Sequence, residues 1–486
     1  MTNPLNRQNL HPANLNPENL ENPYAPATPE LRDLPEPPRH LWKMVGPGVV
    51  AAGVGISSGE FILWPYIASQ VGLVFLWAAV LGIITQLFLN MEIERYTLAT
   101  GETALTGFNR FWRHWGLVFA VMVYFANLWP GWALSSATLA TFLFGGSPTV
   151  VGIAMLLVIG VSLTLAPVVY VALERLIFVK VALVLGLIVL AVAFAVSGDT
   201  WRELPRSLAS VGTVPGQLGF ALLLGAAAFA GAGGGQNLCQ SNWIRDKGFG
   251  MGMYVPRLVS PLTGEEVATA SAVHSYTFEP TAENLSRWRR WWRFANLEQA
   301  ATFAAVSIIT ICLTSMLAHS TLYGEPGLPN NVGFLRIEGE RLQSIVAPWF
   351  GLLFWATGAF SLFGSAMGIT DYTSRLTADV LKSTYLRQSP ISESRLYFWL
   401  VWGLVAIGCG IILLGMNQPM ALLVISASVG GTMMFLYSGL LLVLNRTHLP
   451  APIRISPGRI AWLVWAMVFF GFLAGMTLWQ QAQRFL

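Results

Sequence analysis

Apolar residues gather in eleven long runs that are separated by short polar segments. Each run has roughly 20 residues or more, which is enough to cross a hydrocarbon core of about 30 Å as an α-helix. The runs cover residues 44–71, 73–94, 115–143, 148–167, 176–197, 217–243, 298–320, 343–368, 394–415, 419–444 and 458–480. This pattern predicts an all-α membrane protein with eleven transmembrane helices.

The composition places almost the whole chain in lipid. Of 486 residues, 54% are hydrophobic and 11% are charged, whereas about 25% of the residues in soluble domains are charged. Residues 41–486 are therefore predicted to form one transmembrane domain with the lipid bilayer as its partner and no nucleic acid. Residues 1–40 are rich in Asn and Pro and lack an apolar core, so they are expected to form a disordered tail rather than a signal peptide.

The distribution of Lys and Arg sets the expected orientation. If the N-terminus lies in the cytoplasm, eleven spans put 23 of the 28 basic residues on the cytoplasmic side. Such an excess is the usual mark of cytoplasmic segments. We therefore expect a multi-pass protein of the plasma (inner) membrane with a cytoplasmic N-terminus and an outside C-terminus.

One connection, residues 244–296, is much longer than the others and is predicted to be cytoplasmic. It ends in "SRWRRWWRF", residues 286–294. Alternating Arg and Trp suit the headgroup zone of a bilayer. The sequence is compatible with a regulatory lipid contact, but it favours a simple interfacial anchor.

Two of the apolar runs contain helix-breaking residues at membrane depth. Residues 53–66 read "GVGISSGEFILWPY" and residues 231–242 read "GAGGGQNLCQSN". Irregular backbone inside a membrane is tolerated where protein or a wet cavity satisfies its polar groups. Because spans one and six open the two halves of a five-plus-five inverted repeat, matching breaks there point to a central transport site. The alternative is close helix packing through small residues without any break.

These segments resemble the Nramp family of divalent-metal transporters. The resemblance rests on "GPGVVAAGVGISSGEF" from Gly46, "GAGGGQNLCQS" from Gly231 and "SLFGSAMGITDYTSRLTADVLKS" from Ser361. It implies a LeuT-type inverted repeat with an additional eleventh helix, and helices 1 and 6 unwound at mid-membrane. It also implies that a divalent metal ion is the transported substrate rather than a resident cofactor.

The chain departs from the family at both metal-binding motifs. Where the family has Asp-Pro-Gly-Asn, this chain has Ser57, Ser58, Gly59 and Glu60, and where it has Met-Pro-His-Asn, this chain has Gly234, Gly235, Gln236 and Asn237. The soft thioether is lost and oxygen donors remain, a set that suits Mg²⁺ or Mn²⁺, with Fe²⁺ also open. The third span carries Asn127, which releases no proton, so proton coupling is doubtful.

The expected substrate-binding residues are Ser57, Gly59, Glu60, Gly233, Gly234, Gln236 and Asn237, with Asn127, Cys239 and Ser426 as possible additions. The main hypothesis is a secondary transporter or facilitator of divalent cations, with Glu60 supplying the charge. The alternative is a transporter of a small organic solute such as an amino acid, bound by half-helix N-termini. No catalytic motif indicates an enzyme.

Other ionisable residues lie near the ends of the apolar runs. Lys180, Glu174 and Arg175 at the start of the fifth run are expected to reach the membrane interface or to pair there, and a cytoplasmic gate is the alternative. Asp371, Arg375 and Asp379 recur at a spacing of four, which predicts an ion pair at the cytoplasmic end of the eighth helix.

Overall fold

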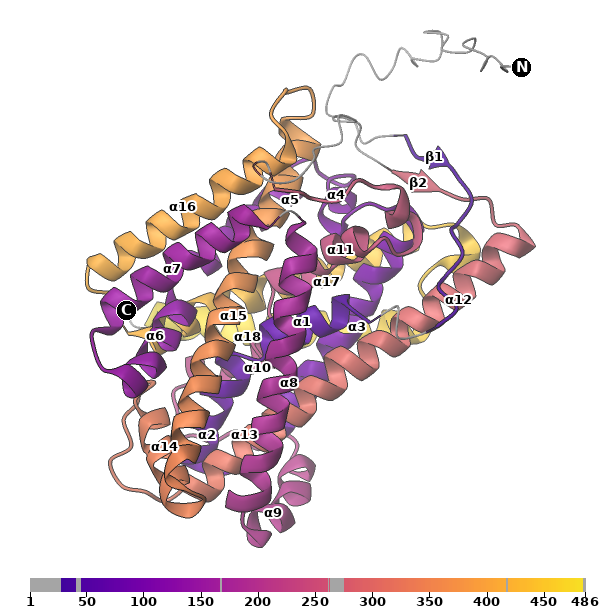
Figure 1. Ribbon diagram of the computed structural model, residues 1–486. Helices are drawn as coiled ribbons and strands as arrows, with labels where there is room; N and C mark the ends of the chain where they lie inside the picture. The colour runs from indigo at the N-terminus through magenta and orange to yellow at the C-terminus, as the bar shows by residue number, and fades with distance from the viewer. Residues whose placement is uncertain are drawn as a thin grey trace, which may run out of the picture.

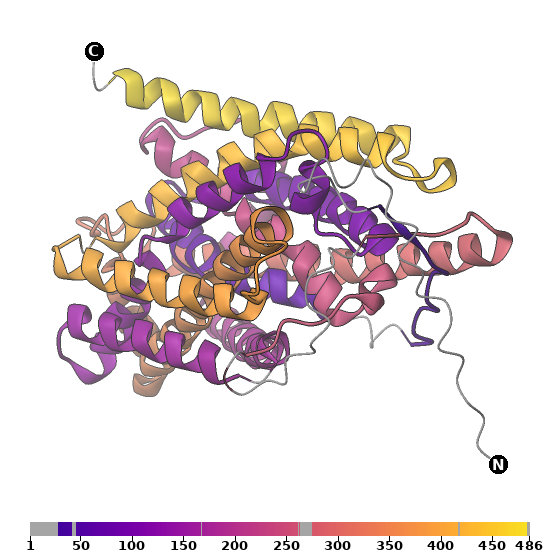
Figure 2. The same cartoon turned by 90° about the horizontal axis from the view of Figure 1, so that it is seen from above.

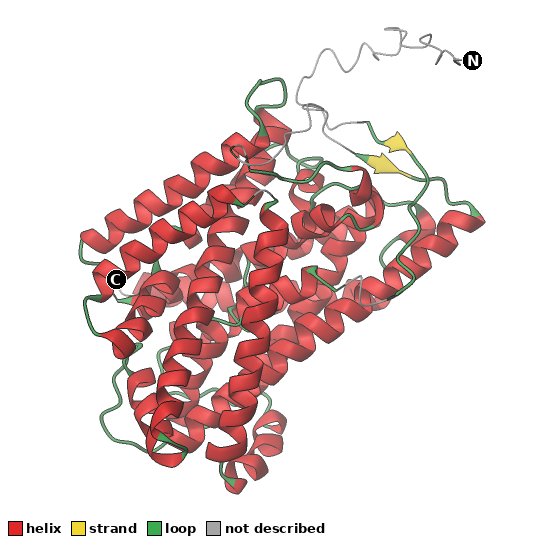
Figure 3. Ribbon diagram, viewed as in Figure 1, coloured by secondary structure: helices red, strands yellow, loops and turns green. Residues whose placement is uncertain are grey.

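The computed structural model describes residues 28–40, 45–166, 168–260, 262, 275–416 and 418–483. Almost all of them are helical, and the helices pack into a single bundle (Figures 1 and 3). The one described sheet pairs β1 (Glu30–Leu31) with β2 (Tyr276–Thr277) in parallel. This mostly helical architecture agrees with the sequence.

Ten helical stretches of the described chain are long and apolar enough to cross a membrane. They are built from α1 (Pro47–Gly55), η4 (Ser58–Leu63) and α2 (Trp64–Val71); α3 (Leu76–Thr100); α5 (Trp115–Asn127) and α6 (Gly131–Phe144); α7 (Pro148–Leu165); α8 (Val169–Ala195); α12 (Ala282–Glu298), η6 (Gln299–Ala304) and α13 (Ala305–Leu322); α15 (Pro348–Val380) and η7 (Leu381–Tyr385); α16 (Glu393–Leu413); α17 (Pro419–Thr447); and α18 (Pro457–Gln483). The run 217–243 is not among the ten, because it is divided into the shorter helices α10 (Phe220–Ala228) and α11 (Gly235–Lys247). The remaining short helices are α4 (Ala104–Phe108), α9 (Gly198–Ala209), η5 (Gly250–Tyr254), α14 (Phe334–Ile345) and η8 (Ala451–Ile453).

Residues 28–40 differ from the disordered tail that the sequence predicts, while residues 1–27 lie outside the described chain. Leu34 is fully buried, and the Trp291 indole of α12 donates a hydrogen bond of 2.7 Å to the Pro35 carbonyl. The end of the long connection 244–296 is helical, because α12 continues without interruption into η6 and α13. Pairing of β1 with β2 and packing on α12 hold residues 28–40 against the bundle, and neither contact is visible in local composition.

An ionic cluster closes the end of the bundle where α4 and α11 lie (Figure 1). The buried Arg375 guanidinium donates to Asp371 at 2.9 Å and also to Asp246 of α11. Arg245 pairs with Asp379 at 2.6 Å. The predicted ion pair between Asp371 and Arg375 is therefore confirmed, whereas Asp379 pairs with a different helix.

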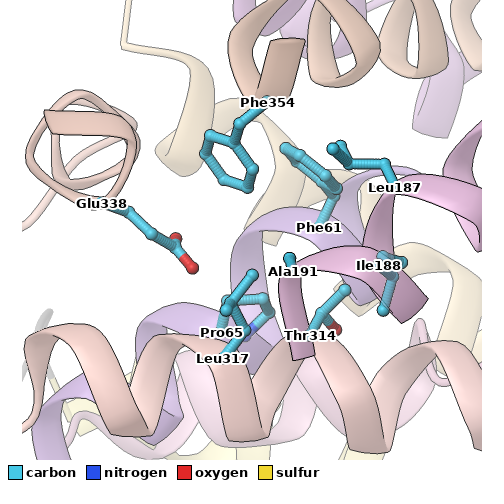
Figure 4. Close-up of a pocket in the computed structure, with 9 residues that line it drawn as sticks. All are labelled: Phe61, Pro65, Leu187, Ile188, Ala191, Thr314, Leu317, Glu338 and Phe354. Atoms are coloured by element: carbon cyan, nitrogen blue, oxygen red, sulfur yellow. The ribbon is translucent and has the colours of Figure 1, made fainter. Parts of the chain in front are cut away.

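The helix α14 covers the opposite end of the bundle. Figure 4 shows Glu338 of α14 pointing into a small cavity beside Phe61, Pro65 and Phe354. The rings of Phe61 and Phe354 stack with centroids 5.3 Å apart. Burial raises the pKa of Glu338 to about 8. The neutral form of the Glu338 carboxyl group is thus favoured in this apolar cavity.

Candidate functional site

The first break separates α1 from η4. The chain leaves the α-helix at Ile56 and resumes as a π-helix at Ser58, so the last carbonyl groups of α1 lose their usual partners. In the structure, six consecutive carbonyl oxygens, residues 51–56, each accept a hydrogen bond from the protein. Their donors, in order, are Gln236 Nε2, Ile56 N, Lys180 Nζ, Ser365 Oγ, Ser57 N and Ser361 Oγ. Each carbonyl group at the end of α1 therefore has a hydrogen-bond donor within the protein.

The Lys180 side chain supplies two hydrogen bonds at this break. It lies in α8 and is fully buried, not at the interface where the sequence places it. Its ammonium group donates to the Gly53 carbonyl at 2.6 Å and to the Ser365 hydroxyl. The C-terminal end of a helix carries a partial negative charge. The Lys180 side chain therefore complements the carbonyl end of α1.

The second break lies between α10 and α11, at residues 229–234. Gln86 of α3 bridges it: its amide nitrogen donates to the Ala230 carbonyl at 2.7 Å, and its oxygen accepts from the Ala232 N–H at 3.1 Å. Asn237 donates to Asn90 of α3 at 2.7 Å. Polar side chains of α3 therefore replace the helical hydrogen bonds that the glycine-rich segment lacks.

The two breaks meet backbone to backbone. A Cβ atom added at Gly55 would lie 1.6 Å from the Gly231 carbonyl oxygen, and one at Gly59 would lie 2.2 Å from the Phe229 carbonyl oxygen. Gly231 also has a φ of 92°, a conformation that favours glycine. Glycine is thus required at these positions because two main chains approach each other closely. Helix packing through small residues, the alternative from the sequence, does not by itself require so close an approach.

A cavity of about 20 Å³ lies between the breaks. Its polar lining comes from Ser57, Ser58 and Gln236, and its aromatic lining from Trp132, Phe229 and Tyr372. The Trp132 indole donates to the Ser58 hydroxyl at 2.9 Å. Gly59 and Gly233 form bare backbone walls. A volume of this size holds about one water molecule, so the cavity is closed down in this conformation.

Two predicted site residues, Glu60 and Asn237, point away from this cavity. Glu60 is fully buried and accepts a hydrogen bond from Thr310 of α13. Its main-chain carbonyl accepts from Thr314 at 2.7 Å. Its second carboxylate oxygen, Oε1, has no hydrogen-bond partner among the described residues. The structure therefore brings Ser57, Gly59, Gly233 and Gln236 together but directs Glu60 toward α13 and Asn237 toward α3.

The other predicted residues are spread over neighbouring helices. Gly234 packs against Gly430 of α17, since an added Cβ would lie 2.5 Å from the Gly430 Cα. Asn127 donates to Thr373 at 3.0 Å. Cys239 and Ser426 are buried in α11 and α17 and do not line the described cavity. Within the described ranges, no group of three or more His, Cys, Asp or Glu side chains is arranged to hold a metal ion.

Sequence reasoning missed the groups that satisfy the breaks: Gln86, Asn90, Lys180, Ser361 and Ser365. Gln86 and Asn90 could have been noticed, because they are polar residues one helical turn apart inside an apolar run. Lys180 is a charged residue within a span, which marks a functional candidate by default.

Comparisons with known proteins agree on the fold. No protein-family model matches the chain, and no curated protein matches it in sequence. A mutant of the Eremococcus coleocola manganese transporter matches with a TM-score of 0.67 and 12% identity over 93% of this chain and 89% of that one. The same transporter in complex with an aromatic bis-isothiourea compound gives a TM-score of 0.64 at 12% identity, over 93% and 90% of the two chains.

A further solved structure shares the architecture. MhsT in complex with L-phenylalanine matches with a TM-score of 0.50 and 12% identity over 91% of this chain and 99% of that one. Both matches have low identity and define the fold alone. The chain has the helical fold of LeuT-type membrane transporters.

Proposed function

We propose that the protein is a secondary transporter or facilitator that works by alternating access. Two broken helices meet at a cavity, and protein groups close the bundle toward both ends, which is the arrangement from which such transporters rock open. The proposal counts α10 and α11 as one interrupted span, giving eleven spans in a five-plus-five repeat plus one. It also keeps the N-terminus in the cytoplasm and the C-terminus outside, as the Lys and Arg distribution indicates.

The substrate class that the cavity supports best is a small organic solute with a carboxylate, such as an amino acid. The helical segments η4 and α11 begin at Ser58 and Gly235, beside the cavity. The first N–H groups of a helix lack partners and favour anions. Three aromatic rings suit an organic body. The observation that carries the proposal is that every carbonyl group of residues 51–56 already accepts a hydrogen bond from the protein, one of them from the Lys180 side chain, so none of them needs a cation as a partner.

A divalent cation is the second candidate, and one observation favours it. Glu60 Oε1 is buried without a hydrogen-bond partner among the described residues, and an unpaired carboxylate oxygen at membrane depth is costly. A cation that reached Glu60 after a side-chain rotation would remove that cost. The described cavity itself presents neutral oxygen atoms, whereas Mg²⁺ and Ca²⁺ usually bind at least one carboxylate.

Uptake by proteoliposomes separates the two candidates. We expect uptake of labelled amino acids or short carboxylates, at the same rate when choline replaces Na⁺, and no uptake of Mn²⁺ or Mg²⁺. Glu60→Gln keeps an acceptor for Thr310, so we expect solute uptake within about threefold of the wild type. If Glu60 instead binds a cation, the same variant loses metal uptake by about 100-fold or more, the scale of a lost buried charge pair. Metal uptake with that sensitivity would replace the organic-solute proposal.

A further inference from the structure

A second cavity, of about 290 Å³, lies at the end of the bundle that the Lys and Arg distribution assigns to the cytoplasm. It is bordered by α3, α12, the segment around η8 and the start of α18. Its charged and aromatic lining consists of four arginines and two tryptophans: Arg95, Arg289, Arg454, Arg459, Trp288 and Trp292. We call it the arginine pocket. It is far larger than the central cavity and plays no part in the proposed transport path.

The arginine pocket carries an excess of positive charge. Arg95 and Arg459 share one carboxylate, Glu92, at 2.8 and 3.1 Å. Arg289 and Arg454 have no ion-pair partner within the described residues, and both are exposed. Even with the buried Glu94 of α3 counted as charged, positive groups outnumber negative ones by two. The pocket is therefore built for an anion.

The pocket is also held in shape before any ligand binds. The Trp288 and Trp292 rings stack with centroids 6.0 Å apart. The guanidinium carbon atoms of Arg95 and Arg459 lie 4.0 and 4.7 Å from the Trp292 ring centroid, within the range of cation–π attraction. Arg454 donates to the Leu449 carbonyl at 2.8 Å, which fixes the rim at η8. Binding of an anion would therefore cost little further conformational entropy in these side chains.

We propose that the arginine pocket binds the phosphate group of an anionic phospholipid from the cytoplasmic leaflet. A guanidinium cluster matches phosphate oxygens in charge and geometry. A lipid is favoured over a free anion because the pocket continues into a lipid-facing surface: α18, which runs along the outside of the bundle in Figure 2, starts at the pocket and exposes Val464, Val468 and Phe472. Acyl chains would lie along this face while the headgroup sits in the pocket.

Native mass spectrometry of the full-length protein in detergent tests the proposal with phosphatidylglycerol, phosphatidylcholine and inorganic phosphate as probes. We expect phosphatidylglycerol to bind in preference to phosphatidylcholine. A guanidinium group that contacts the phosphate contributes at least about a fivefold gain in affinity through a charge-assisted hydrogen bond, so Arg289→Gln with Arg454→Gln, both lining the pocket, should weaken phosphatidylglycerol binding about 30-fold. The matched control, Arg290→Gln with Arg293→Gln, changes two exposed arginines of α12 outside the pocket and should stay within about threefold.

Three outcomes would overturn the proposal. They are equal loss of phosphatidylglycerol in both double variants, equal affinity for the two lipids, and displacement of the lipid by inorganic phosphate at about 1 mM, which would assign the pocket to a soluble anion. Thermal unfolding of each variant checks folding. The single variant Arg289→Gln, which removes no hydrogen bond of the described structure, should still weaken binding about fivefold and keeps the test valid if the double variant is unstable.

Discussion

Replacing Lys180 by Met is expected to abolish transport and to destabilise the folded protein. The substitution keeps a long side chain but removes the ammonium group that donates to the Gly53 carbonyl and to Ser365. Each of the two buried acceptors that lose this donor costs about 1–3 kcal/mol, and no water is at hand at this depth to replace the donor. We expect uptake to fall about 100-fold or more and the thermal unfolding midpoint to fall with it.

Lys247→Met is the matched control for this variant. Lys247 forms an ion pair with Glu174 at 2.6 Å, but its side chain is 24% exposed. An ion pair that reaches solvent contributes about 0–1 kcal/mol, so this variant should transport and unfold nearly as the wild type does. Wild-type uptake by Lys180→Met would show that the end of α1 does not need the Lys180 donor.

Replacing Gly55 by Ala is expected to prevent the two breaks from meeting. The added methyl group would lie 1.6 Å from the Gly231 carbonyl oxygen. A Cβ atom is fixed to its own main chain and the carbonyl belongs to the other, so neither can move without a shift of the backbone. Overpacking in a core costs about 1–3 kcal/mol when side chains can shift, so a main-chain overlap should cost more. We expect loss of uptake and a large drop in the yield of monodisperse protein on size-exclusion chromatography.

Gly186→Ala in α8 is the control for the glycine substitution. A Cβ atom at Gly186 would meet nothing within 4 Å, and Ala is favoured over Gly inside a helix by about 1 kcal/mol. This variant should fold and transport normally. If Gly55→Ala behaved in the same way, the close approach of residues 55 and 231 would not describe the working protein.

The membrane class and the position of both breaks could be predicted from the sequence because they depend on local composition. Apolar runs set the helices, and the clustered glycine and polar residues of "GVGISSGE" and "GAGGGQN" lower helix stability there. The residues that complete the site could not be predicted in the same way. Whether Glu60 faces the cavity or α13 depends on how the helices are rotated against one another, and one sequence carries no such information.

Lys180 shows how an error in a helix boundary moved a site residue. The apolar run starts at 176 and so places Lys180 near the membrane surface, whereas α8 begins at Val169. At 3.6 residues per turn, Lys180 is therefore about three turns into the helix. At that depth its amino group reaches the Gly53 carbonyl at the end of α1.

The most direct test of the account is the accessibility of residue 57 to thiol reagents from each side of the membrane. In a background with Cys239, Cys312 and Cys409 replaced by Ala, Ser57→Cys places a thiol in the central cavity. The control Ala79→Cys places one in the buried core of α3. If the cavity opens alternately to the two sides, a small membrane-impermeant methanethiosulfonate should label Ser57→Cys in both right-side-out and inside-out vesicles and should label Ala79→Cys in neither. Labelling of Ser57→Cys from one side alone, or from neither, would contradict the account.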